Sequence, residues 1–395
     1  MSQNTLKVGV TLWFQNMPDM LERGMKDDYR KPIIKPDFQC YQDELKLADL
    51  IEPLGFDRMW TIEHHCSPYG MTVTPTQVLS YMAGRTKRIG FGSMVIVLPW
   101  NDPVRVAGEI ALLDNLMAGR EFKIGVGRGA APQEFAAFRT DYAESRERML
   151  EILDIIRIGL TQEWFSYDGK HYKIPRTTIR PRPLTTDLTS QFLMTWSSPE
   201  TRQLAAQSGC APLYNNLHNW DEVVTSMAEF NGMRHANGWD DLAPTVAGPI
   251  YCSYDKEKVR QAREWVKMTY DSSIWHYGLF NQPSLRKFLA GKTGKELEEA
   301  IEEIRGQSLL LGAFGTPEEV LERLVQAQAK TKYAELICHM NFGLMPNAEA
   351  QENMTLFAQK VLPELKKLKV GNTASVPFAE VERARKAQMP EPTAA

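Results

Sequence analysis

The sequence has 395 residues, of which 43% are hydrophobic and 24% charged, with a formal net charge of −3. This composition is typical of a globular protein with a large core, and the length suits one α/β barrel with insertions. The nearly balanced charge argues against nucleic-acid binding, and no apolar run reaches the roughly 18 residues of a membrane-spanning helix. The opening MSQNTLKVGV lacks the regions of a signal peptide, so a cytoplasmic protein is expected.

Eight short apolar runs are predicted strands, at residues 7–13, 56–63, 88–99, 122–129, 191–198, 211–216, 245–253 and 334–342. Amphipathic stretches predict helices at 41–53, 75–86, 102–117 and 142–160, and further helices that begin near 199, 220, 255 and 316. The run at 88–99 is too continuously apolar for a sheet with one solvated face, which indicates strands buried on both faces.

This alternation predicts a (β/α)8 barrel, the TIM-barrel fold. The alternative is an open doubly wound sheet, but eight strands and a uniform composition favour the barrel. Three insertions are expected: after the first strand (14–40), between the fourth and fifth strands, and between the seventh helix and the eighth strand (274–312). The second of them contains residues 164–175, whose sequence predicts a hairpin. Such long connections are often functional lids or disordered. We expect one barrel domain over 1–369 and a mobile or partner-clasping extension over 370–395.

The five cysteines lie far apart in the sequence, and none belongs to a Cys-x-x-Cys pair. Their scatter argues against a disulfide framework and against a structural zinc site, and it fits a reducing compartment.

Barrel enzymes place their catalytic groups at the carboxyl ends of the strands. This rule selects polar residues that follow predicted strands: Glu63, His64, His65, Arg128, Ser197, Ser198 and His339. A metal-dependent hydrolase would use His64, His65 and His339 with nearby carboxylates. Because successive side chains on a strand point to opposite faces, His64 and His65 cannot both face one metal ion. No HxH or HExxH pattern occurs either, so no metal is expected.

A glycine string, GVGRGA at residues 125–130, satisfies the GxGxxG/A pattern of dinucleotide-binding domains. That fingerprint needs a helix that opens within the glycines. Here Pro132 intervenes, and the next convincing helix starts near Tyr142. The glycines are better explained by a flat or anionic ligand that approaches the backbone closely.

A phosphate site is predicted near the start of the helix at residue 199. Its candidate groups follow the fourth and fifth strands: Arg128, Arg146, Ser197, Ser198 and Thr201. Free N–H groups of a helix N-terminus, hydroxyls and two guanidinium groups together suit a phosphate. The alternative is a pair of surface arginines beside an ordinary serine cap. On these residues alone, a flavin or ligand carrier and an oxygenase both stay open.

Several segments resemble the bacterial luciferase-like family of flavin-dependent monooxygenases, in the order and spacing of that family. They are GFDRMWTIEHH (55–65), GRTKRIGFGSMVIVLPWNDPVRVAGEIALLDNLMAGR (84–120), FKIGVGRG (122–129), SRERMLE (145–151) and WSSPETRQLAAQSG (196–209). Weaker similarity continues through GTPEEVLERL (315–324) and MTLFAQKVLPELK (354–366).

The resemblance implies a barrel that binds reduced FMN, supplied by a separate NAD(P)H-dependent flavin reductase, with FAD as a less favoured cofactor. Oxygen would add to the flavin to give a C4a-(hydro)peroxide. This species would oxygenate a small organic substrate, by Baeyer–Villiger attack on an aldehyde or ketone or by hydroxylation. Reduced F420 is an alternative cofactor that would make the protein a dehydrogenase or reductase. A homodimer, or a heterodimer with a paralogue, is also implied.

By position, the resemblance makes His64 the catalytic histidine, which hydrogen-bonds or transfers a proton in a dry pocket, and His65 its catalytic neighbour. The cofactor-binding positions it implies are Met94 and Val95 at a non-prolyl cis peptide beside the isoalloxazine, Glu134 near the flavin, Arg128, Arg146, Ser198 and Thr201 on the phosphate, and Gly127. Luciferases carry a reactive cysteine where Gly127 stands, so light emission is not expected and a roomier pocket is predicted.

Overall fold

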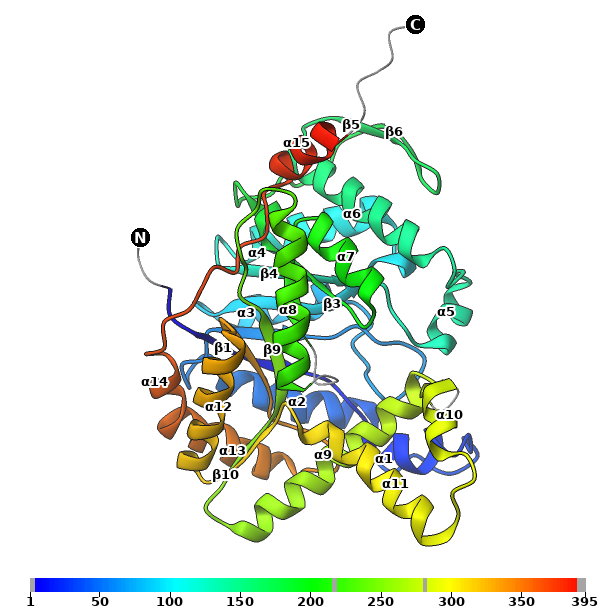
Figure 1. Cartoon of the computed structure of the whole chain (residues 1–395), viewed down its shortest axis with the longest axis vertical. Coiled ribbons are helices and arrows are strands. Elements are labelled where there is room, and N and C mark those ends of the chain that lie inside the picture. Colours follow the sequence, from blue (N-terminus) through cyan, green and yellow to red (C-terminus); the bar gives the residue numbers. More distant parts are fainter. Residues whose placement is uncertain (1–3, 215–218, 280–282, 389–395) are drawn as a thin grey trace, which may run out of the picture.

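Eight parallel strands close into a barrel in the computed structural model, which describes residues 4–214, 219–279 and 283–388 (Figure 1). The barrel strands are β1 (Lys7–Leu12), β2 (Arg58–Thr61), β3 (Gly90–Val97), β4 (Phe122–Gly127), β7 (Phe192–Thr195), β8 (Ala211–Tyr214), β9 (Thr245–Cys252) and β11 (Glu335–His339). Each pairs with the next in this order, and β11 pairs with β1, which closes the ring. The predicted barrel is confirmed, whereas an open sheet would leave two free edges. Residues 215 and 216 of the predicted sixth strand lie outside the described residues.

Amphipathic helices surround this barrel and bury their apolar faces against it. They are α2 (Asp37–Ile51), α3 (Pro75–Arg85), α4 (Pro103–Leu116), α6 (Ser145–Thr161), α7 (Pro199–Gln207), α8 (Trp220–His235), α9 (Lys256–His276), α12 (Pro317–Thr331) and α13 (Asn347–Lys360). Several begin at the caps that the sequence indicates: Asp102 accepts a hydrogen bond from the Arg105 N–H at the start of α4, and Thr316 forms a capping box with Glu319 at α12.

The predicted insertions contain more helix than the sequence indicates. After β1 the chain forms α1 (Met17–Asp19) and the π-helical turn η1 (Met20–Gly24). After β4 comes α5 (Pro132–Phe138), a short helix that the sequence analysis did not predict, and then the predicted hairpin of β5 (Phe165–Asp168) and β6 (Lys173–Thr177). After α9 lie α10 (Pro283–Leu289), α11 (Gly294–Gly306) and β10 (Ala313–Gly315), which pairs with β9. Residues 280–282 of this insertion lie outside the described residues.

Short turns and a final helix complete the fold. The 3-10 turns are η2 (Leu98–Trp100), η3 (Leu188–Gln191) and η5 (Gln307–Leu309), and α14 (Leu362–Leu365) follows α13. Beyond it, α15 (Phe378–Gln388) lies beside α6 (Figure 1), where Arg385 pairs with Asp154. Phe378 and Val381 are buried against Trp239. The described part of the tail is therefore packed on the barrel, whereas its composition predicts a mobile or partner-clasping extension.

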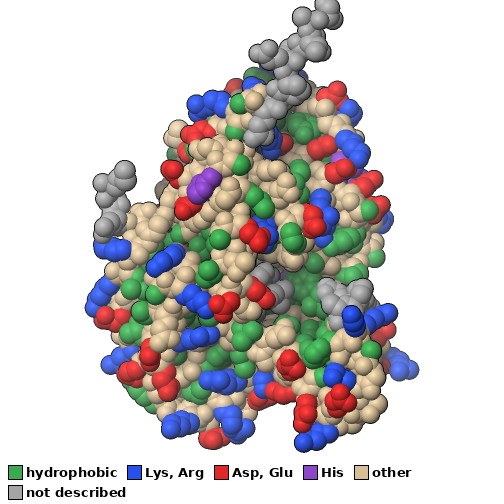
Figure 2. Space-filling model, viewed as in Figure 1, with side chains coloured by type: hydrophobic (Ala, Val, Ile, Leu, Met, Phe, Trp, Pro, Cys, Tyr) green, Lys and Arg blue, Asp and Glu red, His purple; other side chains and the backbone are tan. Residues whose placement is uncertain are grey.

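The surface is mixed in charge. Acidic and basic side chains are interspersed over the face shown in Figure 2, which agrees with the small net charge of −3. Among the described residues, no helix is both long and apolar enough to cross a membrane.

Candidate active site

Parallel strands of a barrel end at one rim, so residues that follow different strands meet there. His64 comes shortly after β2, Val95 lies in the second half of β3, Gly127 ends β4, and Ser198 follows β7. The structure brings the predicted residues to this rim in two groups. One surrounds His64, and the other surrounds Arg128 and Arg146.

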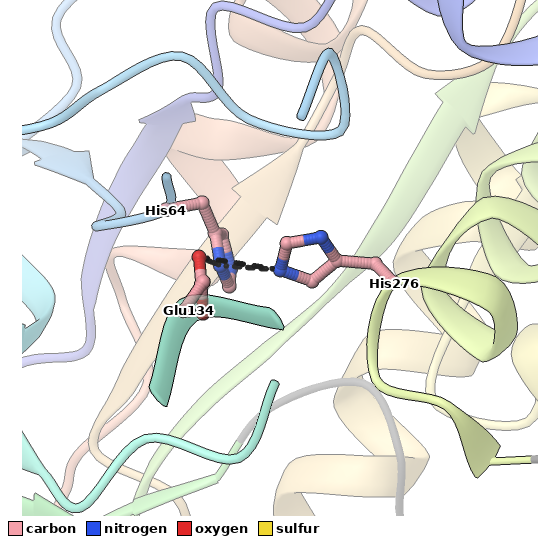
Figure 3. A group of neighbouring side chains, drawn as sticks. All are labelled: His64, Glu134 and His276. Carbon is pink, nitrogen blue, oxygen red and sulfur yellow. Dashed lines mark hydrogen bonds and ion pairs between the residues drawn. The ribbon is translucent and has the colours of Figure 1, made fainter. Parts of the chain in front are cut away.

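The His64 ring lies at the centre of the first group (Figure 3). Its Nδ1 is 3.2 Å from Oε1 of Glu134, which belongs to α5. The same Nδ1 is 3.1 Å from Nε2 of His276, the last residue of α9. Nε2 of His276 is in turn 3.3 Å from Oε1 of Glu134. All three side chains are buried, and Glu134 and His276 almost completely.

Glu134 is the only carboxylate in direct contact with the His64 and His276 rings among the described residues. Its Oε1 also accepts a 2.6 Å hydrogen bond from the His65 backbone N–H. Burial raises the pKa of Glu134, but the hydrogen bonds from His276 and His64 outweigh burial and bring the pKa to about 2. The carboxylate is therefore ionised, and its Oε2 is buried without a partner.

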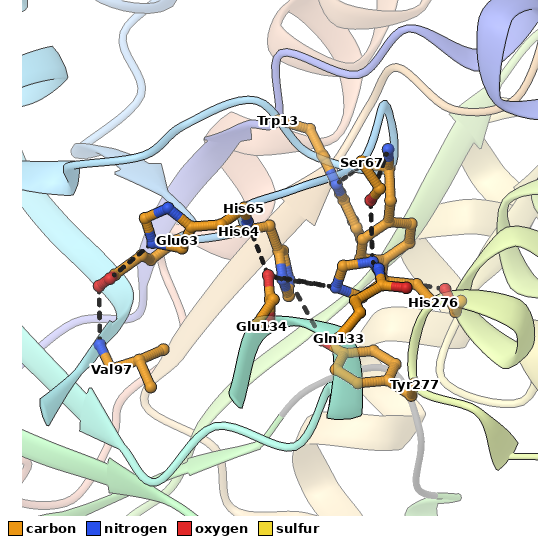
Figure 4. Close-up of polar contacts among 12 residues, drawn as sticks. Trp13, Glu63, His64, His65, Ser67, Val97, Gln133, Glu134, His276 and Tyr277 are labelled. Atoms are coloured by element: carbon orange, nitrogen blue, oxygen red, sulfur yellow. Dashed lines mark hydrogen bonds and ion pairs between the residues drawn. The ribbon is translucent and has the colours of Figure 1, made fainter. Parts of the chain in front are cut away.

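His276 is held in a neutral state. Its Nδ1 accepts a 2.8 Å hydrogen bond from the Gln133 amide and lies 2.9 Å from the Ser67 hydroxyl (Figure 4). Because Nδ1 is an acceptor, the imidazole carries its proton on Nε2, which faces Glu134. Burial lowers the pKa of His276 to about 4, so this ring stays uncharged at neutral pH.

Two tyrosines complete the surroundings of His64. The Tyr277 hydroxyl is 3.2 Å from Nε2 of His64. The Tyr69 ring stacks on His276, with ring centres 4.4 Å apart and planes at 21°, and meets His64 edge-on at 4.9 Å. Burial raises the pKa of Tyr69 to about 12 and holds that of Tyr277 well above its ordinary value, so both are neutral hydrogen-bonding groups.

The His65 side chain turns away from this group. Its Nε2 is 3.1 Å from Glu63, whose other oxygen accepts a 2.8 Å hydrogen bond from the Val97 N–H (Figure 4). Its ring packs edge-on against Trp100 and Phe138. The segment after β2 thus places the His64 and His65 side chains in separate surroundings.

The histidines of the metal-hydrolase alternative do not meet, because His65 pairs with Glu63 and His339 packs edge-on against Trp13. The described part of the chain contains one other group of potential metal ligands whose ligand atoms lie within 4.8 Å of one another. It consists of His64, Glu134 and His276. The closest pairs lie 3.1–3.3 Å apart. Both ring nitrogens lie within hydrogen-bond distance of Oε1 of Glu134, which can accept from each, so we interpret the group as two imidazole N–H groups that share one carboxylate oxygen.

Met94 and Val95 are joined by a cis peptide bond, as the family resemblance implies. Both side chains are half-buried in an otherwise buried strand. The predicted roomier pocket at Gly127 is wrong, because a Cβ added there would lie 2.7 Å from Cγ2 of Val95 and 3.3 Å from Cγ2 of Thr195. The Val95 side chain fills the space that a cysteine side chain would need.

Arg128 and Arg146 lie together in the second group. The Arg128 guanidinium stacks on the Tyr142 ring at 4.3 Å and donates a hydrogen bond to its hydroxyl. Arg146 lies 3.6 Å from Glu200 at the start of α7, and its Nε is buried without a partner. Burial lowers the pKa of Arg128, and the nearby Arg146 charge lowers it further. Two guanidinium groups this close favour an anion between them.

The hydroxyls of the predicted phosphate site belong to the same group. Ser198 caps α7 by accepting a 3.4 Å hydrogen bond from the Thr201 N–H, and its hydroxyl is 3.3 Å from that of Thr201. Ser197 precedes it and is exposed. The N-terminus of α7, these hydroxyls and the unpartnered Arg146 Nε fit a phosphate group.

Sequence reasoning did not identify His276, Tyr277, Gln133 or Tyr69 as site residues. His276 and Tyr277 lie in the insertion 274–312, so its unusual length was the available signal. A cavity of about 790 Å³ adjoins the site, lined by Ala130, Pro132, Phe135, Ala136, Arg139, Thr140, Asp141, Tyr142, Tyr277 and Gly278. This volume is typical of small-molecule sites.

Comparison with known proteins identifies relatives of the whole barrel. Residues 9–331 match the family of luciferase-like monooxygenases. The alkanal monooxygenase alpha chain of the Kryptophanaron alfredi symbiont is 26% identical over 339 residues, which cover 82% of this chain and 92% of that protein.

Two solved structures share the architecture. One is the oxygenating constituent of 3,6-diketocamphane monooxygenase from the CAM plasmid of Pseudomonas putida, in complex with FMN, with a TM-score of 0.68, 18% identity and coverage of 93% of this chain and 100% of that chain. The other is an F420-dependent secondary alcohol dehydrogenase in complex with an F420–acetone adduct, with a TM-score of 0.66, 14% identity and coverage of 91% and 99%. At these identities the two likenesses show the fold alone.

Proposed function

The chain belongs to the luciferase-like monooxygenase family and is a flavin-dependent monooxygenase, and we propose that it is the oxygenating component of a two-component system. It takes reduced FMN from a separate NAD(P)H-dependent reductase and oxygenates a small organic substrate, by Baeyer–Villiger insertion or by hydroxylation. Reduced FMN, when bound, supplies the activation of oxygen.

The observation that carries this proposal is the phosphate site at the barrel rim. Arg128 and Arg146 lie close together, and the Arg146 Nε is buried without a partner. Glu200, in the first turn of α7, lies 3.6 Å from Arg146, so Ser198 and the N-terminus of α7 lie in the same region. We assign the FMN phosphate to these groups. Met94 and Val95 lie in β3, which pairs with β4, and Gly127 ends β4, so we place the flavin ring along these two strands.

The residues of this chain then orient the cofactor and handle protons. Glu134 holds Nδ1 of His64, which leaves Nε2 as the atom that takes or gives a proton. His64 is only 9% exposed and Glu134 is fully buried, so little water reaches this proton. Exclusion of water protects reactive intermediates and strengthens the electrostatic interactions of the site.

The first experiment identifies the cofactor. The purified protein receives reduced FMN, reduced FAD or reduced F420 anaerobically, then oxygen and a panel of aldehydes, ketones and aromatic compounds. We expect oxygenated product with reduced FMN, and negligible NADH oxidation until a flavin reductase is added. Turnover with reduced F420 and without oxygen would instead assign the protein to the dehydrogenases of this fold, and flavin binding without product would make it a carrier.

The second experiment tests His64. General acid–base groups contribute roughly 10²- to 10⁴-fold to rates, so His64→Ala should lower product formation by about that factor. Affinity for reduced FMN should change only a few-fold, because the phosphate site supplies most of the binding. His65→Ala should do less damage, because the His65 ring pairs with Glu63. Near-normal turnover by His64→Ala would refute the proposed role.

A further inference from the structure

Two consecutive residues reach His64 from the C-terminal end of α9. His276 is the last residue of that helix, and Tyr277 is its C-cap. His276 contacts Nδ1 of His64 and Tyr277 contacts Nε2, so this one turn touches both ring nitrogens (Figure 4). The two residues lie more than two hundred positions after His64, in a segment that the family resemblance did not assign to the site.

The protons around Glu134 follow from the partners of His276. Because Gln133 donates to Nδ1 of His276, the proton of this neutral ring is on Nε2 and points to Oε1 of Glu134. His64 must also present an N–H to this ionised oxygen, since a lone pair 3.2 Å from a buried carboxylate would be repelled. His64 is therefore the tautomer with its proton on Nδ1, and the 3.1 Å contact between this Nδ1 and Nε2 of His276 joins two donors to the same carboxylate oxygen rather than a donor and an acceptor.

In this tautomer Nε2 of His64 is an acceptor, and the Tyr277 hydroxyl is its donor. This hydrogen bond fixes Nε2 as the acceptor nitrogen and therefore favours the tautomer with its proton on Nδ1. His276 acts in the same direction, because its N–H shares Oε1 of Glu134 with the N–H of His64 and so helps to hold the carboxylate opposite Nδ1. The two contacts reinforce each other.

The remaining groups around His64 do not change the hydrogen-bonding roles of its two ring nitrogens. Tyr69 faces the ring from the loop after β2 and is neutral. The His65 and Glu63 side chains pair with each other, away from the cluster. Among the described residues that contact the His64 ring, Glu134 is the only charged one.

We propose that His276 and Tyr277 are positioning residues that fix the orientation of the His64 ring and its tautomer, with the proton on Nδ1 and the lone pair on Nε2. They act through His64 rather than on the substrate. Their role in turnover rests on the proposed function, whereas their effect on the His64 ring does not. Since Tyr277 also lines the 790 Å³ cavity, the same side chain connects the proton-accepting nitrogen to the space that a substrate would enter.

The tautomer of His64 is tested directly by ¹⁵N NMR of histidine-labelled protein without flavin. The His64 signals are identified as those that disappear in His64→Asn. Wild type should show a protonated Nδ1 and an acceptor Nε2 for His64. Tyr277→Phe removes one hydroxyl and should move the Nε2 signal toward that of an unbonded acceptor nitrogen. His276→Leu removes the second donor to Glu134, and His276→Gln, which retains an N–H near the same position, should restore the wild-type signals. His235→Gln, on a half-exposed histidine that pairs with Asp241, is the control and should change nothing.

Kinetics give the second readout. His276→Leu should lower kcat by about 10- to 100-fold, the range for a hydrogen bond to a charged group, and Tyr277→Phe by about 2- to 10-fold. The KM for substrate should change little with His276→Leu.

Three results would overturn the inference: unchanged His64 signals in both Tyr277→Phe and His276→Leu, failure of His276→Gln to restore what His276→Leu removes, or one tightly bound divalent metal ion per chain in the purified protein. A wild-type protein with the expected NMR signals but no oxygenation of any substrate would refute the proposed function and leave the positioning of His64 supported.

Discussion

Gly127 offers a sharp test of how the rim of the barrel is packed. A methyl group added there would lie 2.7 Å from Cγ2 of Val95, whereas ordinary contacts are 3.4–4 Å, so the valine side chain has to retreat. Strand β3 pairs with β2 up to Ser93 and with β4 on both sides of Val95, at Ser93 and at Ile96, which limits how far the backbone that carries Val95 can shift. Overpacking of this kind typically costs about 1–3 kcal/mol. We therefore expect Gly127→Ala to lower the free energy of unfolding by about that amount.

The assay is urea unfolding of the flavin-free protein, followed by intrinsic fluorescence and circular dichroism. Val95→Ala removes the methyl groups that meet the new Cβ, so the double variant should be more stable than the sum of the single effects predicts, by about 0.5–3 kcal/mol. The control is Gly108→Ala in α4, where a Cβ meets nothing within 4 Å. There the loss of backbone freedom in the unfolded chain should stabilise the protein by about 0.4–1 kcal/mol.

Two results would refute this reasoning. Gly127→Ala as stable as wild type would mean that Val95 moves freely, and strictly additive effects of the two substitutions would mean that their side chains do not meet. If the packing is as described, Gly127→Cys should also weaken reduced-FMN binding, because the displaced Val95 lies where we place the flavin ring.

Three further predictions concern other parts of the molecule. Arg146→Ala should weaken reduced-FMN binding by about 1.5–3 kcal/mol and leave riboflavin, which has no phosphate, unaffected; equal losses in anaerobic titrations would make the arginine structural. Burial lowers the pKa of both His276 and His339 to about 4, so the unfolded state binds more protons than the folded state between pH 6.5 and 4. The free energy of unfolding should fall as pH drops through this window, and a flat profile in urea titrations would contradict it. Val381 of α15 is fully buried, so Val381→Ala should lower the free energy of unfolding by about 2 kcal/mol. The control Lys386→Ala, at an exposed position of the same helix, should cost less than about 0.5 kcal/mol. Equal melting temperatures of the two variants would show that α15 does not support the fold.

The sequence by itself determined the barrel fold and the rim of the barrel at which the candidate site residues lie. Hydrophobic periodicity and caps such as Asp102 and Thr316 are local signals, because a few neighbouring residues decide whether a segment forms a strand or a helix. Strand ends are therefore predicted approximately: the second, fifth and eighth predicted strands run to 63, 198 and 342, whereas the observed strands end at Thr61, Thr195 and His339. Since all parallel strands end at one rim, the approximate place of His64 and Arg128 follows as well.

The short helix α5 shows where local signals become too weak. Pro132 and Glu134 are suitable first-turn residues, but seven residues contain less than two full turns of apolar periodicity. The helix forms because Phe135 packs against Trp100 from another element. Only this packing turns Glu134 toward His64.

Tertiary structure alone decided the partners of His64. His276 lies 212 positions away and Tyr277 lies 213 positions away, and no local pattern couples residues so distant. The family resemblance likewise placed a flavin beside Gly127 but could not show that Val95 fills the space there. The physical reason is the same in both cases. Side-chain contacts between strands and insertions depend on how whole elements pack, and a difference of less than one ångström decides whether a nitrogen finds a hydrogen-bond partner or a methyl group finds room.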